Sequence, residues 1–161
     1  MFRIGFGLDS HRFELEKQKK LMLGGIEVIG EKGLKAHSDG DVVLHSIFNA
    51  ISSALGERSI GFYHSDKLAE KENIASHLYL ETVKKMLKEK GYEIVNLAIT
   101  LECKTPKIEP IADAMKASIA KHLSLSIEQI SIIATSGEEL SAFGKGKGIQ
   151  VYSTVLLQKK A

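Results

Sequence analysis

Two short segments of the sequence carry side chains that are able to bind a divalent metal ion. Asp9 and His11 lie two positions apart in an extended segment, so their side chains point to the same side of the chain. His45 lies one turn into a predicted helix, shortly after a segment with further titratable residues, 37–41. One Asp and two His form a common set of three zinc ligands that leaves a fourth position open for substrate. Imidazole and carboxylate lone pairs are also donors that a borderline-soft divalent ion accepts.

Each of these features also has an ordinary structural explanation. A histidine with apolar neighbours on a helix, such as His45 near Val42 and Ile47, is more often a hydrogen-bonded core residue than a metal ligand. An Asp-x-His pair is common in proteins, and Asp39-Gly40-Asp41 is equally compatible with a turn followed by a helix cap. These residues alone therefore give a metal site and its absence about equal weight.

A glycine-rich segment near the C-terminus offers groups that bind anionic oxygens. Residues 135–148 contain four glycines, the lysines Lys145 and Lys147, and hydroxyl donors at Thr135 and Ser136. The segment matches neither a Walker A loop nor a dinucleotide fingerprint. A hairpin loop with solubilising lysines is the simpler explanation of this loop taken alone. In the same way, residues 104–107 are compatible with the start of a helix that has proline at its first position.

Apolar periodicity predicts the elements that must position these side chains. Helices are expected over residues 41–55, 74–90 and 106–123. Strands are expected over residues 2–13, 92–102, 129–134 and 149–157, with a hairpin over 21–29 around Gly24-Gly25. This order is typical of an α+β or α/β fold in which helices pack on one face of a sheet.

Length and composition narrow the class of protein. A chain of 161 residues with 43% hydrophobic and 26% charged residues predicts one ordered domain over 1–161. A net charge of +2 gives no reason to expect a nucleic-acid partner. A single cysteine, Cys103, excludes an internal disulfide and is compatible with a reducing compartment. Because no apolar run approaches the ~20 residues of a membrane span, and no signal peptide is evident, we expect a soluble, cytoplasmic protein without a membrane partner.

Taken in chain order, these segments resemble the 2-C-methyl-D-erythritol 2,4-cyclodiphosphate synthase family. The sequence GLDSHRF at 7–13 is similar to the first family motif, and the ungapped AHSDGDVVLH at 36–45 is similar to the second. TPK at 105–107, ATSGE at 134–138 and GKGKG at 144–148 resemble its nucleotide and phosphate loops. The resemblance spans the whole chain, and its segments occur in the family's order and spacing.

The resemblance implies a metal-dependent reaction of the non-mevalonate isoprenoid pathway. The substrate is 4-diphosphocytidyl-2-C-methyl-D-erythritol 2-phosphate, whose 2-phosphate attacks the β-phosphorus, closes a cyclic diphosphate and expels CMP. A phosphate monoester is already ionised near neutral pH, so positioning and charge stabilisation matter more than a strong base. The family also implies an α+β fold with a mixed sheet covered by helices on one face. It implies a homotrimer whose active sites lie between subunits, with the zinc site and the nucleotide loop supplied by different chains.

Roles for individual residues follow from the resemblance. Asp9, His11 and His45 correspond to ligands of a zinc-type ion, and Glu138 to a ligand of a second ion, Mg²⁺ or Mn²⁺, on the diphosphate. His37 and Ser136 correspond to catalytic residues that stabilise the transition state. The residues that correspond to substrate contacts are Asp9, His11, His37, Ser38, Ser59, Ile60, Gly61, His64, Asp66, Cys103, Lys104, Thr105, Pro106, Lys107, Ile108, Glu109, Thr135, Ser136, Gly137, Glu138, Ala142 and Lys145.

The chain departs from the family pattern mainly in the segment 56–68. Ser59 stands where the family usually has aspartate, and HSDKL at 64–68 replaces Phe-Pro-Asp-x-Asp. These positions contact the methylerythritol end of the substrate in the family. Ala142 replaces a usual phenylalanine, and Lys147 an acidic residue. A non-catalytic module that binds a cytidine nucleotide or an isoprenoid phosphate on the same trimer is therefore an alternative, although the intact metal ligands favour an enzyme.

Overall fold

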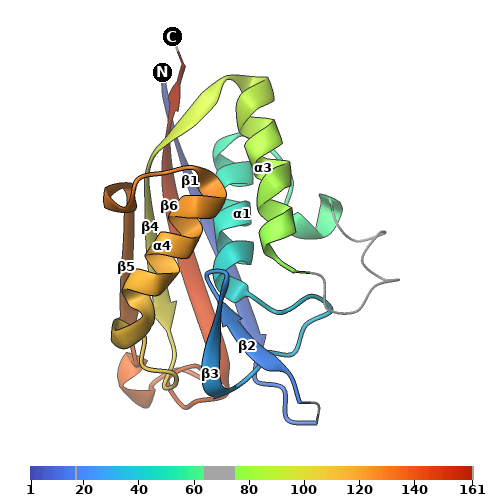
Figure 1. The fold of residues 1–161 in the computed structure, drawn as a ribbon, viewed down its shortest axis with the longest axis vertical. Helices are drawn as coiled ribbons and strands as arrows, with labels where there is room; N and C mark the ends of the chain where they lie inside the picture. Colours follow the sequence, from blue (N-terminus) through green and yellow to red (C-terminus); the bar gives the residue numbers. More distant parts are fainter. Residues whose placement is uncertain (17, 64–74, 161) are drawn as a thin grey trace.

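The computed structural model describes residues 1–16, 18–63 and 75–160. Four strands form a sheet in the order β1-β6-β4-β5 (Figure 1). They span Phe2–Arg12 (β1), Tyr92–Glu102 (β4), Ile130–Thr135 (β5) and Gly148–Lys159 (β6). Strand β6 pairs antiparallel with β1 and β4, whereas β4 and β5 are parallel. The mixed sheet expected from the sequence is therefore confirmed.

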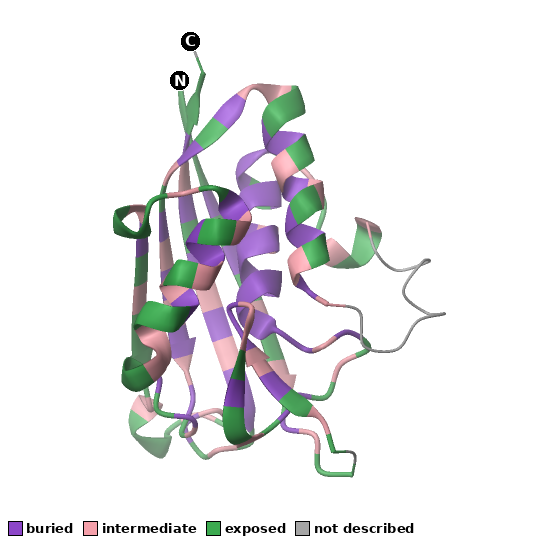
Figure 2. Ribbon diagram, viewed as in Figure 1, coloured by how far each residue is buried: buried purple, intermediate pink, exposed green. Residues whose placement is uncertain are grey.

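Three helices cover one face of this sheet (Figure 1). They are α1 (Val42–Ala54), α3 (His77–Lys90) and α4 (Ala112–Leu123). Short 3-10 turns occur at η1 (Glu109–Ile111), η2 (Ile127–Gln129) and η3 (Gly137–Glu139), and residues 60–63 are also helical. The core lies between the helices and the inward side chains of the sheet, which alternate along β6 (Figure 2). No helix within the described ranges is long and apolar enough to cross a membrane.

A separate two-stranded hairpin consists of β2 (Lys20–Leu23) and β3 (Ile26–Lys32). The turn between the strands is Gly24-Gly25, as expected, and both residues have positive φ, +62° and +82°. Such a turn matches the natural twist of a hairpin, and glycine adopts it without steric penalty.

Two helix starts differ from the sequence-based expectation. The helix expected from residue 106 begins at Ala112, so its predicted start is wrong by six residues, 106 against 112. The backbone N–H groups of Cys103 and Lys104 donate to the carbonyls of Thr135 and Phe143, which holds the segment after β4 as a loop against the glycine-rich segment. The helix expected from residue 74 is described from His77 onward.

Two glycines allow α1 to lie unusually close to β1. A Cβ atom added to Gly5 would lie 1.9 Å from the carbonyl oxygen of Ala50, and one added to Gly7 would lie 2.1 Å from that of Ser46. Both distances are far below van der Waals contact, so no larger residue fits without moving the helix. The inward face of β1 is therefore the glycine face, and it continues directly into Asp9 and the site described below.

The outward face of the sheet is largely apolar, and no helix among the described residues covers it. Leu8, Tyr152, Thr100 and Ile133 are register partners, so they form one row across the four strands. Leu8 and Ile133 are 45% and 63% exposed, and Phe6 on the same side of β1 is 57% exposed. An apolar sheet face of this kind is typical of a surface that is buried against another protein surface.

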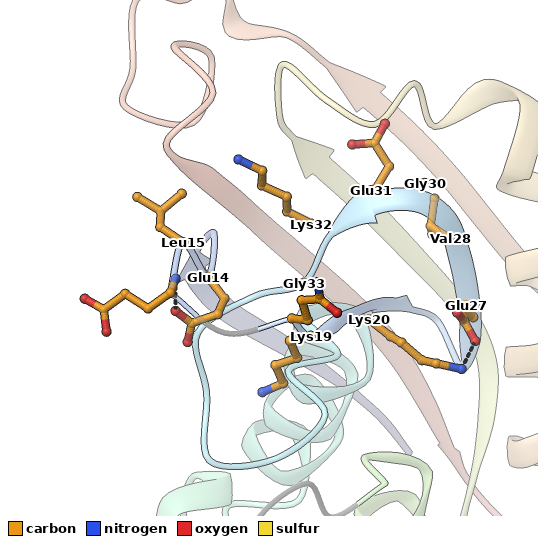
Figure 3. Close-up of a pocket in the computed structure, with 12 residues that line it drawn as sticks. Glu14, Leu15, Lys19, Lys20, Glu27, Val28, Gly30, Glu31, Lys32 and Gly33 are labelled. Carbon is orange, nitrogen blue, oxygen red and sulfur yellow. Dashed lines mark hydrogen bonds and ion pairs between the residues drawn. The ribbon is translucent and has the colours of Figure 1, made fainter.

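A pocket of about 540 Å³ lies between the β2–β3 hairpin and the segment after β1 (Figure 3). Its lining includes the carboxylates Glu14 and Glu31 and the lysines Lys19 and Lys32. None of the described residues that the sequence marks as candidate ligands or substrate contacts lines this pocket, so we do not assign it to the site described below.

Asp41 connects the hairpin to the start of α1. It is fully buried, and its carboxylate accepts the N–H groups of Gly24 and Gly25 at 2.9 and 2.6 Å. The same carboxylate accepts the N–H groups of Val43 and Leu44, both at 3.1 Å, as the N-cap of the helix. The expected capping role of Asp41 is therefore confirmed, and one side chain orders both elements.

Replacing Asp41 with alanine should lower the free energy of unfolding by about 2–5 kcal/mol, because a helix cap is lost and buried N–H groups lose their acceptor. Urea denaturation would measure the change. Asp41→Asn keeps one acceptor oxygen, so it should lie between Asp41→Ala and the wild type. An unfolding midpoint of Asp41→Ala equal to that of the wild type would contradict the proposed connection.

Candidate active site

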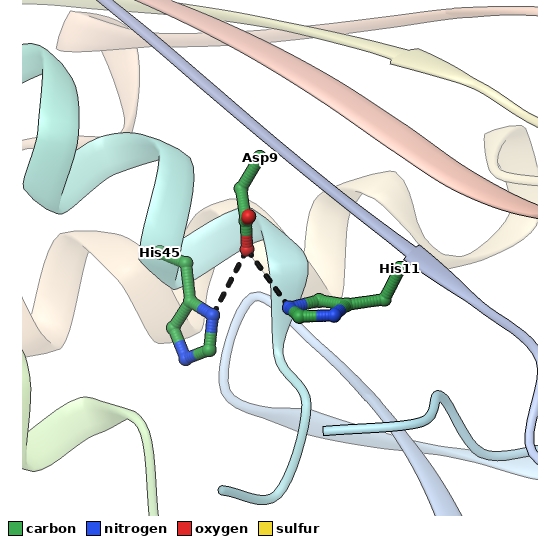
Figure 4. Close-up of side chains that lie close together, drawn as sticks. All are labelled: Asp9, His11 and His45. Atoms are coloured by element: carbon green, nitrogen blue, oxygen red, sulfur yellow. Dashed lines mark hydrogen bonds and ion pairs between the residues drawn. The ribbon is translucent and has the colours of Figure 1, made fainter. Parts of the chain in front are cut away.

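Asp9, His11 and His45 converge beside the edge strand β1, on the face of the sheet that the helices cover (Figure 4). Asp9 and His11 project from β1, and His45 projects from the first turn of α1. Asp9 Oδ2 lies 3.0 Å from His45 Nδ1 and 3.1 Å from His11 Nε2. The three ligand atoms all lie within 4.8 Å of one another. Because His45 is buried while Asp9 and His11 are half-buried, the group is open to solvent on one side.

The electrostatics of this group favour a cation. Burial raises the pKa of Asp9, but the neighbouring imidazoles of His11 and His45 lower it by more and hold that pKa well below its ordinary value. The carboxylate is therefore an anion at neutral pH. His11 Nε2 is buried and makes no hydrogen bond of acceptable geometry. A buried nitrogen without such a bond, beside a carboxylate oxygen and a second imidazole, fits the donor set of a divalent metal ion.

The second ring nitrogen of His45 faces away from this group. His45 Nε2 lies 2.9 Å from Ser76 Oγ and 3.3 Å from Ser38 Oγ. The Asp39 carboxylate accepts the backbone N–H of Ser76 at 2.8 Å and is also bonded by the Ser76 hydroxyl. The Tyr79 ring packs against the His45 ring, with centroids 5.5 Å apart. These contacts fix the orientation of the His45 ring.

The glycine-rich segment and the segment after β4 form a second group of polar residues. A pocket of about 460 Å³ is lined by Lys104, Lys107, Ser136, Glu138, Glu139 and Gly144. None of the three residues in the Asp-His-His group lines it. Residues from 104–107 and 136–138 therefore lie around one pocket, which agrees with the expectation that they serve one binding region. The expected metal ligands of β1 and α1 lie elsewhere in the same chain.

The backbone at η3 is strained where it presents acidic side chains to this pocket. Glu138 and Glu139 have φ values of +49° and +60°, in the left-handed region that residues other than glycine rarely adopt. A hydrogen bond from Lys104 Nζ to Glu139 Oε1, 2.6 Å long, lowers the pKa of Glu139. Gly137 N–H donates to Thr135 Oγ1 at 3.0 Å. Strain of this kind is concentrated at functional sites.

The residues after β4 alternate between buried and exposed positions. Burial raises the pKa of the Cys103 thiol to about 11, so the thiol is protonated at neutral pH and is not a nucleophile. The Cys103 thiol points to the carbonyl of Pro106 at 3.6 Å, and Ile108 is also buried. The Thr105 hydroxyl donates to Glu31 Oε1 at 3.1 Å. The exposed residues of this stretch are Lys104, Lys107 and Glu109.

The other expected contact residues are spread around these two groups. His37 lies exposed before α1, and Ala142 and Lys145 lie exposed in the glycine-rich segment. Ser59 and Gly61 are exposed near the turn after α1, Glu109 is exposed at η1, and Ser38 is buried beside His45. The expected contacts His64 and Asp66 lie outside the described residues.

Three polar residues were not identified from the sequence. Asn49 lies one turn after His45; its amide donates to Leu8 O at 3.2 Å and accepts Ile60 N–H at 3.0 Å. Helical spacing from His45 was the signal that would have found it. Asp39 was interpreted only as part of a turn. For Ser76 the sequence offers no signal, because its contact with His45 depends on how α3 packs.

The fold and these groups define a class of α+β proteins that combine an Asp-His-His group able to hold a divalent ion with a glycine-rich, lysine-containing loop. A model of the YgbB family matches residues 2–158. The chain therefore belongs to the YgbB family.

Individual relatives agree with this assignment. The chain is 42% identical over 160 residues to a 2-C-methyl-D-erythritol 2,4-cyclodiphosphate synthase of Fusobacterium nucleatum, covering 99% of both chains. It is 38% identical over 161 residues to the enzyme of that name from Leptospira interrogans, covering all of both. Among solved structures, it resembles the CDP complex of IspF from Plasmodium falciparum, with 31% identity, a TM-score of 0.86 and coverage of 99% and 97%. It also resembles the bifunctional IspDF of Campylobacter jejuni, with 33% identity and a TM-score of 0.88, covering 99% of this chain and 43% of that one.

His45→Ala should abolish tight binding of a divalent ion while leaving a folded protein, because the described part of the chain offers no other group of three such ligands. Metal content after dialysis, measured by mass spectrometry, and circular dichroism would check both expectations. His37→Ala is the matched control, since His37 is exposed and outside the group. Wild-type metal content in His45→Ala would refute the assignment.

Proposed function

We propose that the chain converts 4-diphosphocytidyl-2-C-methyl-D-erythritol 2-phosphate to 2-C-methyl-D-erythritol 2,4-cyclodiphosphate with release of CMP, as an enzyme of the non-mevalonate isoprenoid pathway. The observation that carries this proposal is similarity over the full chain to synthases of that name, in a chain that keeps the Asp-His-His group. The neighbour titled as a CDP complex supports a cytidine-linked substrate. The whole of 1–161 serves as one synthase domain.

In this reaction an oxygen of the 2-phosphate forms a bond to the β-phosphorus, and the bond from that phosphorus to the CMP oxygen breaks. Asp9, His11 and His45 would hold a zinc-type ion, and Glu138 would hold a second ion, Mg²⁺ or Mn²⁺. Metal ions at these positions neutralise charge on the phosphoryl groups when bound. His37 and Ser136 donate hydrogen bonds to oxygens that gain charge in the transition state.

The remaining residues of the site bind and orient the two ends of the substrate. Residues 103–109 and 135–138 enclose the cytidine end, and Lys145 pairs with phosphate. Ser38 contacts a phosphate, and residues 59–61, His64 and Asp66 contact the methylerythritol end. Holding both ends fixes the attacking oxygen near the β-phosphorus, so the closure of the ring proceeds without the entropy loss of a free encounter.

The working enzyme is a homotrimer. Support comes from the exposed apolar face of the sheet, which a second copy of the chain would bury. Further support comes from the separation of the Asp-His-His group from the pocket around Glu138 within one chain. A site completed by a neighbouring copy brings the two groups together. The cytoplasmic location expected from the sequence stays a prediction.

The alternative of a non-catalytic module that binds a cytidine nucleotide or an isoprenoid phosphate is not favoured. Such a module needs only the pocket around residues 104–107 and 136–144. It gives no reason for an anionic Asp9 between two imidazoles or for a buried His11 nitrogen that lacks a well-formed hydrogen bond.

The direct test is turnover of the cytidine-linked substrate by purified protein with Zn²⁺ and Mg²⁺ present. Stoichiometric CMP and cyclic diphosphate, followed by phosphorus NMR, are the expected products, and a chelator should stop their formation. Binding of the substrate without release of CMP under these conditions would favour the non-catalytic module and overturn the proposal.

Glu138→Gln should lower turnover by orders of magnitude and lower CMP affinity only slightly, because its carboxylate would hold the second ion, which neutralises diphosphate charge, whereas CMP has one phosphate. The neighbouring Glu139→Gln is the matched control and should change turnover much less, since Glu139 is paired with Lys104. Steady-state kinetics and calorimetry would separate the two effects. Equal losses in turnover and CMP affinity would mean that Glu138 is a structural residue.

Phe6→Asp should convert the trimer to monomers, because it places a charge on the outward apolar face of β1. Light scattering coupled to size-exclusion chromatography would measure the mass. Leu78→Asp, at an exposed leucine on α3 far from that face, should leave the trimer intact. A trimeric Phe6→Asp, or a monomeric wild type, would contradict the assembly.

A further inference from the structure

The contacts around Ser76 determine where its single hydroxyl proton points. Ser76 is fully buried, at the residue before α3. Its hydroxyl is bonded to Asp39 Oδ1, and its backbone N–H donates to Asp39 Oδ2 at 2.8 Å. Asp39 Oδ1 also accepts the backbone N–H of Asp41 at 3.1 Å. Ser76 Oγ is the donor in its bond to Asp39 Oδ1, so its single proton is directed at that carboxylate.

This arrangement leaves only lone pairs on Ser76 Oγ toward His45. Ser76 Oγ lies 2.9 Å from His45 Nε2, closer than Ser38 Oγ at 3.3 Å. A hydrogen bond across 2.9 Å requires one proton between the two atoms, and the imidazole must supply it. Nε2 of His45 therefore carries the ring proton.

A neutral imidazole has one N–H, so the proton on Nε2 leaves Nδ1 with a free lone pair. Nδ1 is the atom that faces Asp9 Oδ2, at 3.0 Å. His11 Nε2 approaches the same oxygen at 3.1 Å. With the ring proton on Nε2, the lone pair of His45 Nδ1 and the Asp9 carboxylate are both available to bind a cation.

We infer that Asp39 and Ser76 are positioning residues that hold His45 in the Nε2–H tautomer and so present Nδ1 to the metal ion. The inference rests on the proposed metal site at Asp9, His11 and His45. Carboxylates that orient a metal-binding histidine usually contact the ring directly. In this chain a serine hydroxyl stands between them, and it also joins the start of α3 to the segment before α1.

The chain of hydrogen bonds from Asp39 through Ser76 to His45, here called the relay, predicts weaker metal binding when Asp39 or Ser76 is changed. Ser76→Ala removes the acceptor, and Asp39→Asn keeps the shape of the side chain but introduces an amide that can donate to Ser76. Each variant should bind Co²⁺ or Zn²⁺ about 10–100-fold more weakly than the wild type, the range found for partners of metal-binding histidines. Ser76→Thr keeps the hydroxyl and should restore most of the affinity.

A matched control separates this effect from the loss of a buried hydroxyl in general. Ser52→Ala also removes a buried hydroxyl, but Ser52 donates only within α1, to Asn49 O at 3.2 Å. It should bind Co²⁺ with wild-type affinity. Circular dichroism would show that each variant is folded before its metal affinity is compared.

The tautomer itself is measurable by nitrogen NMR of the histidine rings in metal-free protein above neutral pH. Wild-type His45 should show a protonated Nε2. Ser76→Ala and Asp39→Asn should move the proton toward Nδ1, where it would be donated to Asp9. A protonated Nδ1 in the metal-free wild type would overturn the relay.

The His45→Ala variant makes the two possible failures distinguishable. Wild-type Co²⁺ affinity in His45→Ala would refute the proposed metal site, and the proposed relay would be refuted with it. Loss of Co²⁺ binding in His45→Ala, together with wild-type affinity in folded Ser76→Ala and Asp39→Asn, would overturn the relay alone. The expected result is weaker Co²⁺ binding in His45→Ala, Ser76→Ala and Asp39→Asn. Ser76→Thr should recover most of the affinity, and Ser52→Ala should keep the wild-type affinity.

Discussion

The close approach of α1 to β1 is the constraint on which the site depends. Only the absence of side chains at Gly5 and Gly7 lets the helix backbone lie against the strand. Because α1 is this close, His45 in its first turn reaches Asp9 and His11, which follow on the same face of β1. Asp41, as the N-cap, fixes where α1 begins and so places His45 beside Asp9 and His11. The ligand geometry is thus a consequence of backbone packing between two elements that are distant in sequence.

Much of the fold could be predicted from local pattern, whereas contacts between elements could not. The strand at 92–102 and the Gly24-Gly25 turn are set by alternation and by glycine conformation, so their bounds follow from the sequence. Strand β1 shows the limit of this reasoning. Its apolar residues face outward and its glycines face the core, because its inward partner is a helix backbone and its outward face is left for another surface.

The same distinction between local pattern and contacts between elements explains why only part of the candidate site could be predicted from the sequence. The family-like motifs contain Asp9, His11, His45 and Glu138, the residues that the resemblance marks as metal ligands or substrate contacts. Ser76 lies outside every motif, and it reaches His45 only through the packing of α3 on α1. Local sequence records which residues do chemistry, but the residues that orient them are recorded in the tertiary structure.

In the proposed trimer, the Asp-His-His group of one copy and the Glu138 loop of a neighbour complete one site for cyclisation. Co-expression of His45→Ala chains with Glu138→Gln chains would show this, because each inactive chain supplies the half that the other lacks. Random assembly into symmetric trimers should restore about one quarter of wild-type turnover. Turnover of the mixture no higher than that of either variant alone would contradict the account.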